Sequence, residues 1–302
     1  MSSPPFEASD PESILDYSDN MRNLQEGSCQ CPLVEGMPFT LQFRDTPSKP
    51  QDTIQSVRPA PHLPYGKSCE YVLSRPLQVG EDYNSQVWVA THPGQEYADV
   101  VLKFIAPSGL PLPDDYAPDM IAVLIESGQY RYPADIIHCQ VSAYRALKKF
   151  QGSTLPYFFG VQQAMMPWGE EASVLLLEYL PGPTFRAVKD ALKFDLLSSK
   201  YRKFESYLAL AESAFTSVRA AHRLHIYHRD LREENILVDE ANDLAVIIDW
   251  HNDPRTADGH AWEVYGDLMN VGCTFLRCDM HRKEMKKTLR RAHLDIFSNA
   301  CP

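Results

Sequence analysis

One segment of the chain places acidic and amide side chains at a spacing that suits phosphate chemistry. It reads His-Arg-Asp-Leu-Arg-Glu-Glu-Asn over His228–Asn235, so Asp230 and Asn235 lie five positions apart. A carboxylate can orient an acceptor hydroxyl and take its proton, and an amide oxygen a few residues later can face the same cleft and hold Mg²⁺. Asp249 follows Asn235 by 14 positions, directly after the apolar run Val246–Ile248, where a carboxylate can bridge Mg²⁺ to ATP phosphates. The three residues together predict phosphoryl transfer to a hydroxyl.

Strands dominate the elements expected before this segment. The runs Tyr71–Val79, Gln86–Ala90 and Asp99–Ile105 are rich in β-branched and aromatic residues and are separated by turn-forming pieces. This pattern predicts an antiparallel meander. A further apolar strand is expected over Val174–Leu180, where Pro181 and Gly182 end it.

Helices are expected mainly in the second half of the chain. Apolar residues recur at helical spacing in Ile136–Phe150, in the long segment Phe204–Leu224 and in Val264–Leu276. The basic segment His281–His293 is interpreted as the solvated face of another helix. Strands followed by helices, with one crossing near residue 180, predict a two-lobed α+β fold.

The first 65 residues differ in composition from the rest. They contain 10 of the 23 prolines of the chain, and proline removes a backbone donor and fixes φ. We therefore expect residues 1–65 to form a largely extended or disordered arm that is dispensable for folding. One short strand is possible at Phe39–Phe43.

Composition narrows the classes of partner. The chain of 302 residues carries 29 Lys and Arg against 40 Asp and Glu, a net charge of −11. This balance argues against broad binding to nucleic acid or acidic membranes, and no run approaches the roughly 18 apolar residues of a membrane span. Seven scattered cysteines and the absence of a secretory signal over Met1–Asp10 predict an intracellular protein, cytoplasmic or nuclear.

The pattern H-R-D-x-x-x-x-N at His228–Asn235, followed by Asp249, resembles the protein-kinase-like superfamily. Within it, the chain is similar to divergent fungal kinase-like proteins and to aminoglycoside-phosphotransferase-type enzymes. The resemblance covers roughly residues 70–280. It implies a kinase-like domain over residues 66–302, with an antiparallel-sheet N-lobe at 66–180 and a shortened helical C-lobe at 181–302.

The resemblance also implies an ATP site. Lys103 matches the lysine of the third N-lobe strand, which holds the α- and β-phosphates. Gly80 and Val87 are what remains of the glycine-rich loop. In such proteins the backbone of the stretch between the lobes pairs with adenine, here through the Glu178 C=O and the Leu180 N–H.

Four C-lobe positions complete the implied site. Asp230 would be the catalytic carboxylate, while Asn235 and Asp249 would bind Mg²⁺. Arg232 stands where Ser/Thr kinases carry a lysine, and its bidentate guanidinium could neutralise the transferring phosphate. Asp267 resembles the aspartate that holds the catalytic-loop backbone, which is a structural role.

Three departures from the pattern bear on the function: the first two put turnover in question, and the third concerns the class of acceptor. Asp82 stands where the loop Gly80–Val87 should carry a glycine, and its charge is expected to weaken ATP binding. Gln140 occupies the place of the glutamate that pairs with Lys103, with Glu126 as an alternative partner. Because only 18 positions separate Asp249 from Asp267, the usual peptide-binding activation segment is too short.

The sequence therefore predicts an ATP- and Mg²⁺-dependent kinase that phosphorylates a hydroxyl, in either a protein Ser/Thr or a small molecule. The alternative is a pseudokinase that binds nucleotide or partners without turnover. The altered glycine loop and Gln140 favour the pseudokinase, whereas Asp230, Asn235 and Asp249 favour the enzyme.

Overall fold

The computed structural model describes residues 4–45, 57–80, 83–117, 120–194, 199–251 and 261–291. These residues form a mixed α+β fold with an antiparallel sheet, as the sequence predicts. The chain divides into two compact units. The first unit comprises Met1–Pro47, Pro61–Val141 and Phe158–Tyr179, and the second comprises Ser48–Ala60, Ser142–Tyr157 and Leu180–Pro302.

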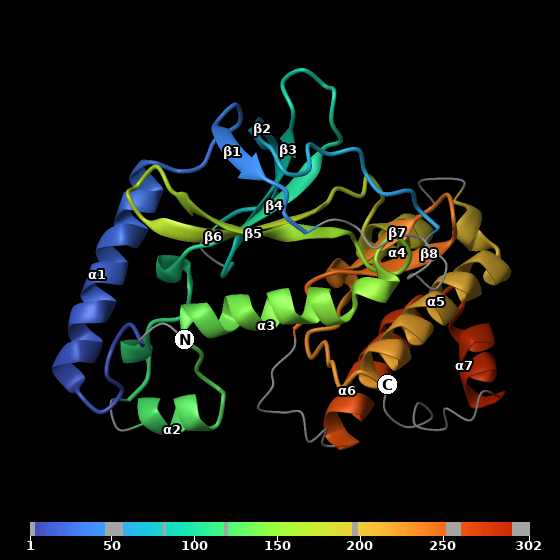
Figure 1. Cartoon of the computed structure of the whole chain (residues 1–302). Coiled ribbons are helices and arrows are strands. Elements are labelled where there is room, and N and C mark those ends of the chain that lie inside the picture. The colour runs from blue at the N-terminus through green and yellow to red at the C-terminus, as the bar shows by residue number, and fades with distance from the viewer. Residues whose placement is uncertain are drawn as a thin grey trace. The chain divides into compact units, whose positions relative to one another are not determined.

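A six-stranded antiparallel sheet is the centre of the first unit (Figure 1). Its order is β1-β2-β3-β4-β6-β5, so β2, β3 and β4 form the predicted meander and β1 pairs with its β2 edge. The strands are β1 (Pro38–Gln42), β2 (Ser68–Gln78), β3 (Gln86–Thr91), β4 (Val100–Ile105), β5 (Phe158–Met165) and β6 (Glu171–Glu178). The side chain of Gln162 on β5 accepts from the Gln42 N–H and donates to the Thr40 C=O, both at 2.9 Å. The sheet thus curls until its two edge strands are linked.

The N-terminal arm contains regular structure, and the expectation of an extended or disordered segment is wrong for most of its described residues. Helix α1 (Pro11–Gln30) begins after Asp10, whose side chain accepts from the Glu12 N–H at 3.0 Å. Pro11 is the first helical residue, where its missing N–H costs nothing and its fixed φ suits the helix. The possible strand at Phe39–Phe43 is confirmed as β1. Residues 46–56 lie outside the described part.

Helix α1 packs within the first unit through both apolar and polar contacts. Ile14 of α1 joins a buried cluster with Ile121 and Tyr130. Arg22 forms an ion pair with Asp114 at 2.6 Å. Two further helices follow the sheet's first four strands: α2 (Ile121–Glu126) and α3 (Pro133–Ala146).

The second unit is mainly helical. Its helices are α4 (Phe185–Phe194), α5 (Phe204–His222), α6 (Ala261–Leu276) and α7 (Arg282–Arg291), and its hairpin is β7 (Ile236–Asp239) with β8 (Leu244–Ile247). The predicted helices in this part are confirmed. Three rings from α4, α5 and α6 pack together in its core, since Phe275 lies 4.4 Å from Phe185 and 5.6 Å from Tyr207 between centroids.

Two observations bear on the expectations about compartment and membrane. Within the described residues, no helix has the length and apolar character to cross a bilayer. Five cysteines carry free thiols: Cys29, Cys31, Cys69, Cys139 and Cys278. Cys273 is disulfide-bonded, which the sequence analysis did not predict.

Candidate catalytic site

The loop between α5 and β7 folds into a tight turn that presents Asp230. The Asp230 N–H donates to the His228 C=O at 2.8 Å, and Arg229 between them has a positive φ of 64°. The Asn235 side-chain amide closes the turn, because its Nδ2 donates to the Asp230 C=O at 2.8 Å and to the Asp230 carboxylate at 3.2 Å. The two predicted residues are therefore neighbours in space. The side chain of Asp230 remains 55% exposed, so a ligand could reach it.

The Asn235 amide oxygen is the atom that fits a cation. Its Nδ2 is already engaged by Asp230, whereas no described residue donates a hydrogen bond to Oδ1. Although Asn235 as a residue is buried, Oδ1 is not sealed from solvent. An amide oxygen held in this way is a hard ligand of the kind that Mg²⁺ takes.

Asp249 is brought to the same loop by the end of β8. The Ile248 N–H donates to the Asn235 C=O at 3.0 Å, and Asp249 follows with a φ of 65°. The Asp249 N–H donates to the Tyr144 hydroxyl at 3.3 Å. Burial raises the pKa of Tyr144, and the negative charge of Asp249 raises it further. The Tyr144 hydroxyl is therefore neutral where it accepts this backbone hydrogen bond.

Asp267 on α6 accepts hydrogen bonds from the backbone of the loop that presents Asp230. It is buried, and its carboxylate accepts from the His228 N–H at 2.7 Å and the Arg229 N–H at 2.8 Å. The His222 ring nitrogen Nε2 lies 3.0 Å from the same carboxylate. The expectation that Asp267 holds the loop backbone is confirmed.

His228 links the loop to the end of β8 as well. Its Nε2 lies 2.7 Å from the Ile248 C=O, and its ring packs edge-on against Trp250 at 4.9 Å. Trp250 is fully buried and donates through its indole N–H to the Ile247 C=O at 3.0 Å. The position of Asp249 is thus fixed on both sides by buried neighbours.

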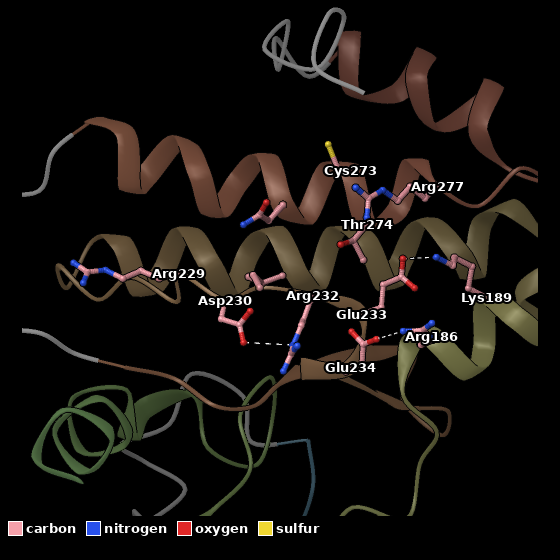
Figure 2. Close-up of a pocket in the computed structure, with 12 residues that line it drawn as sticks. Arg186, Lys189, Arg229, Asp230, Arg232, Glu233, Glu234, Cys273, Thr274 and Arg277 are labelled. Atoms are coloured by element: carbon pink, nitrogen blue, oxygen red, sulfur yellow. Dashed lines mark hydrogen bonds and ion pairs between the residues drawn. The ribbon is translucent and has the colours of Figure 1, made fainter. Parts of the chain in front are cut away.

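A cavity of about 500 Å³ in the second unit includes Asp230 in its wall (Figure 2). Figure 2 shows three ion pairs there: Arg232 with Asp230, Arg186 with Glu234, and Lys189 with Glu233. The Arg232 Nε lies 3.4 Å from the Asp230 carboxylate, so these two predicted residues are also brought together.

The sequence analysis did not find most of the cavity's charged residues. Arg186 and Lys189 lie on α4, and Arg277 directly follows the end of α6. Glu233 and Glu234 lie inside the motif His228–Asn235, so their closeness to Asp230 in the sequence could have indicated them. The other charged residues are distant in the sequence, and Arg186, for example, lies 48 positions before its partner Glu234.

The predicted ATP-binding residues lie mainly in the first unit. Val87 of β3 and Lys103 of β4 are directly opposite each other in the sheet, and Lys103 is buried. Gly80 follows β2 with a φ of 125°, a conformation that favours glycine. Glu178 is the buried last residue of β6, whereas Leu180 belongs to the second unit.

The structure does not show a hydrogen bond from Lys103 to the oxygen of its expected partner Gln140. Gln140 of α3 is buried, but its Oε1 has no hydrogen-bond partner, so this oxygen does not accept from Lys103. Glu126 is exposed at the end of α2. Asp82 lies outside the described residues.

Comparison with known proteins gives no assignment: no family model matches the chain, and no curated protein matches it. Within the described residues, no group of three or more His, Cys, Asp or Glu side chains could hold a metal ion. The candidate site is therefore defined by its hydrogen bonds and charges.

Proposed function

We propose that this chain is a kinase-like phosphotransferase with two lobes, which moves the γ-phosphoryl group of ATP to a hydroxyl. One observation carries the proposal. Asp230 and Asn235 share a hydrogen bond at 3.2 Å, and the Ile248–Asn235 backbone bond at 3.0 Å fixes Asp249 beside the same loop. Two carboxylate residues and one amide residue thereby belong to one loop region, and these are the residue types that phosphoryl transfer uses as a base and as cation ligands.

The chemical step uses the exposed carboxylate of Asp230. The acceptor oxygen attacks the γ-phosphorus, an oxygen–phosphorus bond forms, and the bond from the γ-phosphorus to the bridging oxygen of ADP breaks. The hydroxyl proton passes to Asp230. Arg232 lies beside Asp230 and would offset negative charge on the transferring group.

The remaining roles concern ATP and its cation. Asn235 and Asp249 would hold Mg²⁺, which when bound offsets the charge of the phosphates. The Asn235 Oδ1, which accepts no hydrogen bond from the described residues, supports that assignment. In the first unit, the ATP-binding residues would be Gly80, Val87, Lys103 and Glu178, joined by Leu180 of the second unit.

A pseudokinase is the second candidate, and one observation favours it. The Gln140 Oε1 is buried without a hydrogen bond. An active kinase pairs its lysine with a glutamate, whereas here the residue in that place is an amide whose oxygen accepts no hydrogen bond from Lys103. In this case the chain would bind nucleotide or a partner without turnover.

A thermal-shift titration with ATP, with and without Mg²⁺, tests nucleotide binding. Ligand at about 100 times its Kd adds about 2.7 kcal/mol of stability, so we expect an upward shift of roughly 5 °C with Mg·ATP. Lys103→Met should remove the shift, whereas the exposed Lys149→Met should keep it. The absence of any shift at millimolar Mg·ATP would contradict the enzyme and leave a pseudokinase that binds a partner. A shift without phosphate transfer to any acceptor would leave the pseudokinase.

A further inference from the structure

Arg58 is part of the proline-rich N-terminal arm, yet its backbone is bound within the second unit. The strands on either side of it along the chain, β1 and β2, belong to the first unit, whereas Ser48–Ala60 belongs to the second. The Val57 N–H and the Arg58 N–H both donate to the Gly152 C=O, at 3.0 and 2.8 Å. The Tyr157 hydroxyl donates to the Arg58 C=O at 3.0 Å. Four backbone and side-chain groups thus hold the arm at this residue.

The Arg58 side chain binds two carbonyl groups of one loop and a carboxylate of β7. Its Nη1 donates to the Ser153 C=O at 2.6 Å, and its Nη2 donates to the Leu155 C=O at 2.9 Å. The Asp239 carboxylate lies 3.6 Å from Nη1, and both charged side chains are about nine-tenths buried, at 11% and 10% exposure. A guanidinium presents its donors in a rigid plane, so it sets the spacing of the two carbonyl groups in the loop of residues 151–155.

This loop is hydrogen-bonded to the strand that leads to Asp249. The Thr154 C=O, which lies between the two carbonyl groups bound by Arg58, accepts from the Ile247 N–H at 2.9 Å. Ile247 is the last residue of β8, and Asp249 follows two positions later. A displacement of the loop would therefore release the end of β8 directly before Asp249.

A second set of hydrogen bonds connects the loop to Asp249 through α3. The Gln151 side chain is buried and donates to the Tyr144 C=O at 3.1 Å. The Tyr144 hydroxyl in turn accepts from the Asp249 N–H at 3.3 Å. The bonds through Thr154 and those through Gln151 both start in the loop that Arg58 holds, and both end at or next to Asp249.

We infer that Arg58 is a positioning residue for Asp249. Its guanidinium orders the loop of residues 151–155, and the loop sets the place of the end of β8 and of the carboxylate that follows it. The inference deepens the proposed function and rests on it for the consequence, because Asp249 would bind Mg²⁺ there. Residues that support a metal ligand from outside typically change metal affinity by roughly 10- to 100-fold when they are mutated. Since Arg58 acts through intervening residues, we expect the lower end of that range.

Amide hydrogen exchange of the protein without ligands tests the positioning independently of nucleotide binding. In Arg58→Met, the amides of residues 244–249 should exchange about tenfold faster than in the wild type, because buried carbonyl groups lose their donors and the end of β8 opens locally. The amides of β3 and β4 should keep their rates. Unchanged exchange at residues 244–249, or an equal increase in β3 and β4, would overturn the inference.

Arg44→Met is the matched control for this experiment. Arg44 lies in the same arm, but its guanidinium donates to the Gln42 side chain in the first unit, at 3.0 and 2.7 Å. Its replacement should leave exchange at residues 244–249 unchanged. Faster exchange there in both variants would mean that any change in the arm loosens β8, which also contradicts the inference.

A titration of Mg²⁺ at fixed ATP, followed by thermal shift, gives the functional result. Arg58→Met should raise the Mg²⁺ concentration at the half-maximal shift about tenfold, whereas the shift with ATP alone should stay the same. A purely structural role would lower the melting temperature without moving that midpoint, so an unchanged midpoint would contradict the inference. If the wild type shows no shift with Mg·ATP, the proposed enzyme is contradicted, and hydrogen exchange alone then decides whether Arg58 positions Asp249.

Discussion

The Asn235 side-chain amide donates to two atoms of Asp230, the backbone C=O at 2.8 Å and the carboxylate at 3.2 Å. The shorter of these contacts does not involve the Asp230 side chain. Removing that side chain therefore leaves Asn235 anchored by the backbone bond. The two proposed roles, acceptor activation by Asp230 and cation binding by Asn235, are thus separable by mutation.

Asp230→Ala should accordingly leave ATP affinity nearly unchanged while turnover falls at least ~10²-fold, the usual scale for losing a positioned general base. The check is a phosphate-transfer assay beside a calorimetric ATP titration. Asp279→Ala is the control, since that side chain is 86% exposed. Unchanged turnover on an acceptor that the wild type uses would exclude Asp230 as the base, and joint loss of stability and ATP affinity would indicate a structural role.

Asp249→Asn should abolish the Mg²⁺-dependent part of ATP stabilisation while the fold survives. The change removes one charge without changing shape, and asparagine tolerates the positive φ of 65° found there. Asp243, with a φ of 53°, offers a matched Asp→Asn control in the turn between β7 and β8. Thermal shifts with ATP alone and with Mg·ATP give the answer, and a variant with full Mg·ATP affinity would show that Asp249 is not a ligand.

Asp267→Ala should lower the free energy of unfolding by about 3–5 kcal/mol, because the backbone N–H groups of His228 and Arg229 lose their acceptor in a buried position. Asp267→Asn keeps one acceptor oxygen and should lose less. Urea denaturation of both variants measures the difference. A loss below about 1 kcal/mol for the alanine variant would mean that the loop is held without this carboxylate.

The ion pair between Arg22 and Asp114 should make the anchoring of α1 sensitive to acid. Burial alone would raise the pKa of Asp114, but the hydrogen bond and the positive charge of Arg22 help to lower it below its ordinary value. A carboxyl whose folded-state pKa lies below its unfolded value of about 3.9 stabilises the fold above that value, and this contribution is lost as the pH falls through the folded-state pKa. Wild type should therefore exceed Arg22→Met in stability at neutral pH, and the gap should close below about pH 4.

Asp114→Asn is the companion variant for that experiment. It has no titrating group at this position, so its stability should lack this acid-dependent component. Denaturation midpoints from pH 7 to pH 3 provide the measurement. A gap between wild type and Arg22→Met that stays constant across this range would contradict the assignment.

The N-terminal arm is expected to be necessary for folding, contrary to its composition. Leu41 of β1 is fully buried, whereas Leu15 of α1 is 52% exposed. Leu41→Ala should cost about 2–5 kcal/mol, and Leu15→Ala should cost little. Deletion of residues 1–45 should abolish soluble folded protein, because it uncovers the β2 edge of the sheet. Normal expression and melting temperature of that deletion would refute the prediction.

Local patterns in the sequence determined much of the fold. The alternation of apolar residues located β2, β3 and β4, and helical spacing located α5 and α6. Such elements can be predicted because a strand or helix that buries one face repeats its apolar residues with a fixed period. The five-position spacing of Asp230 and Asn235 likewise placed both in one turn. The proline content of the first 65 residues led to a wrong prediction for α1. A proline at the first position of a helix, such as Pro11, does not disrupt it, so the number of prolines alone does not exclude a helix.

Tertiary structure alone decided the contacts between distant segments. Gln162 meets Gln42 across 120 positions to link the sheet edges, and Arg186 meets Glu234 across 48 positions to shape the cavity. Tyr144 accepts from the Asp249 N–H across 105 positions. Such contacts produce no periodic pattern in the sequence, since they depend on how the packed elements place individual side chains next to one another. Sequence therefore indicated which residues could do chemistry, and packing determined the charge and shape of the cavity around Asp230.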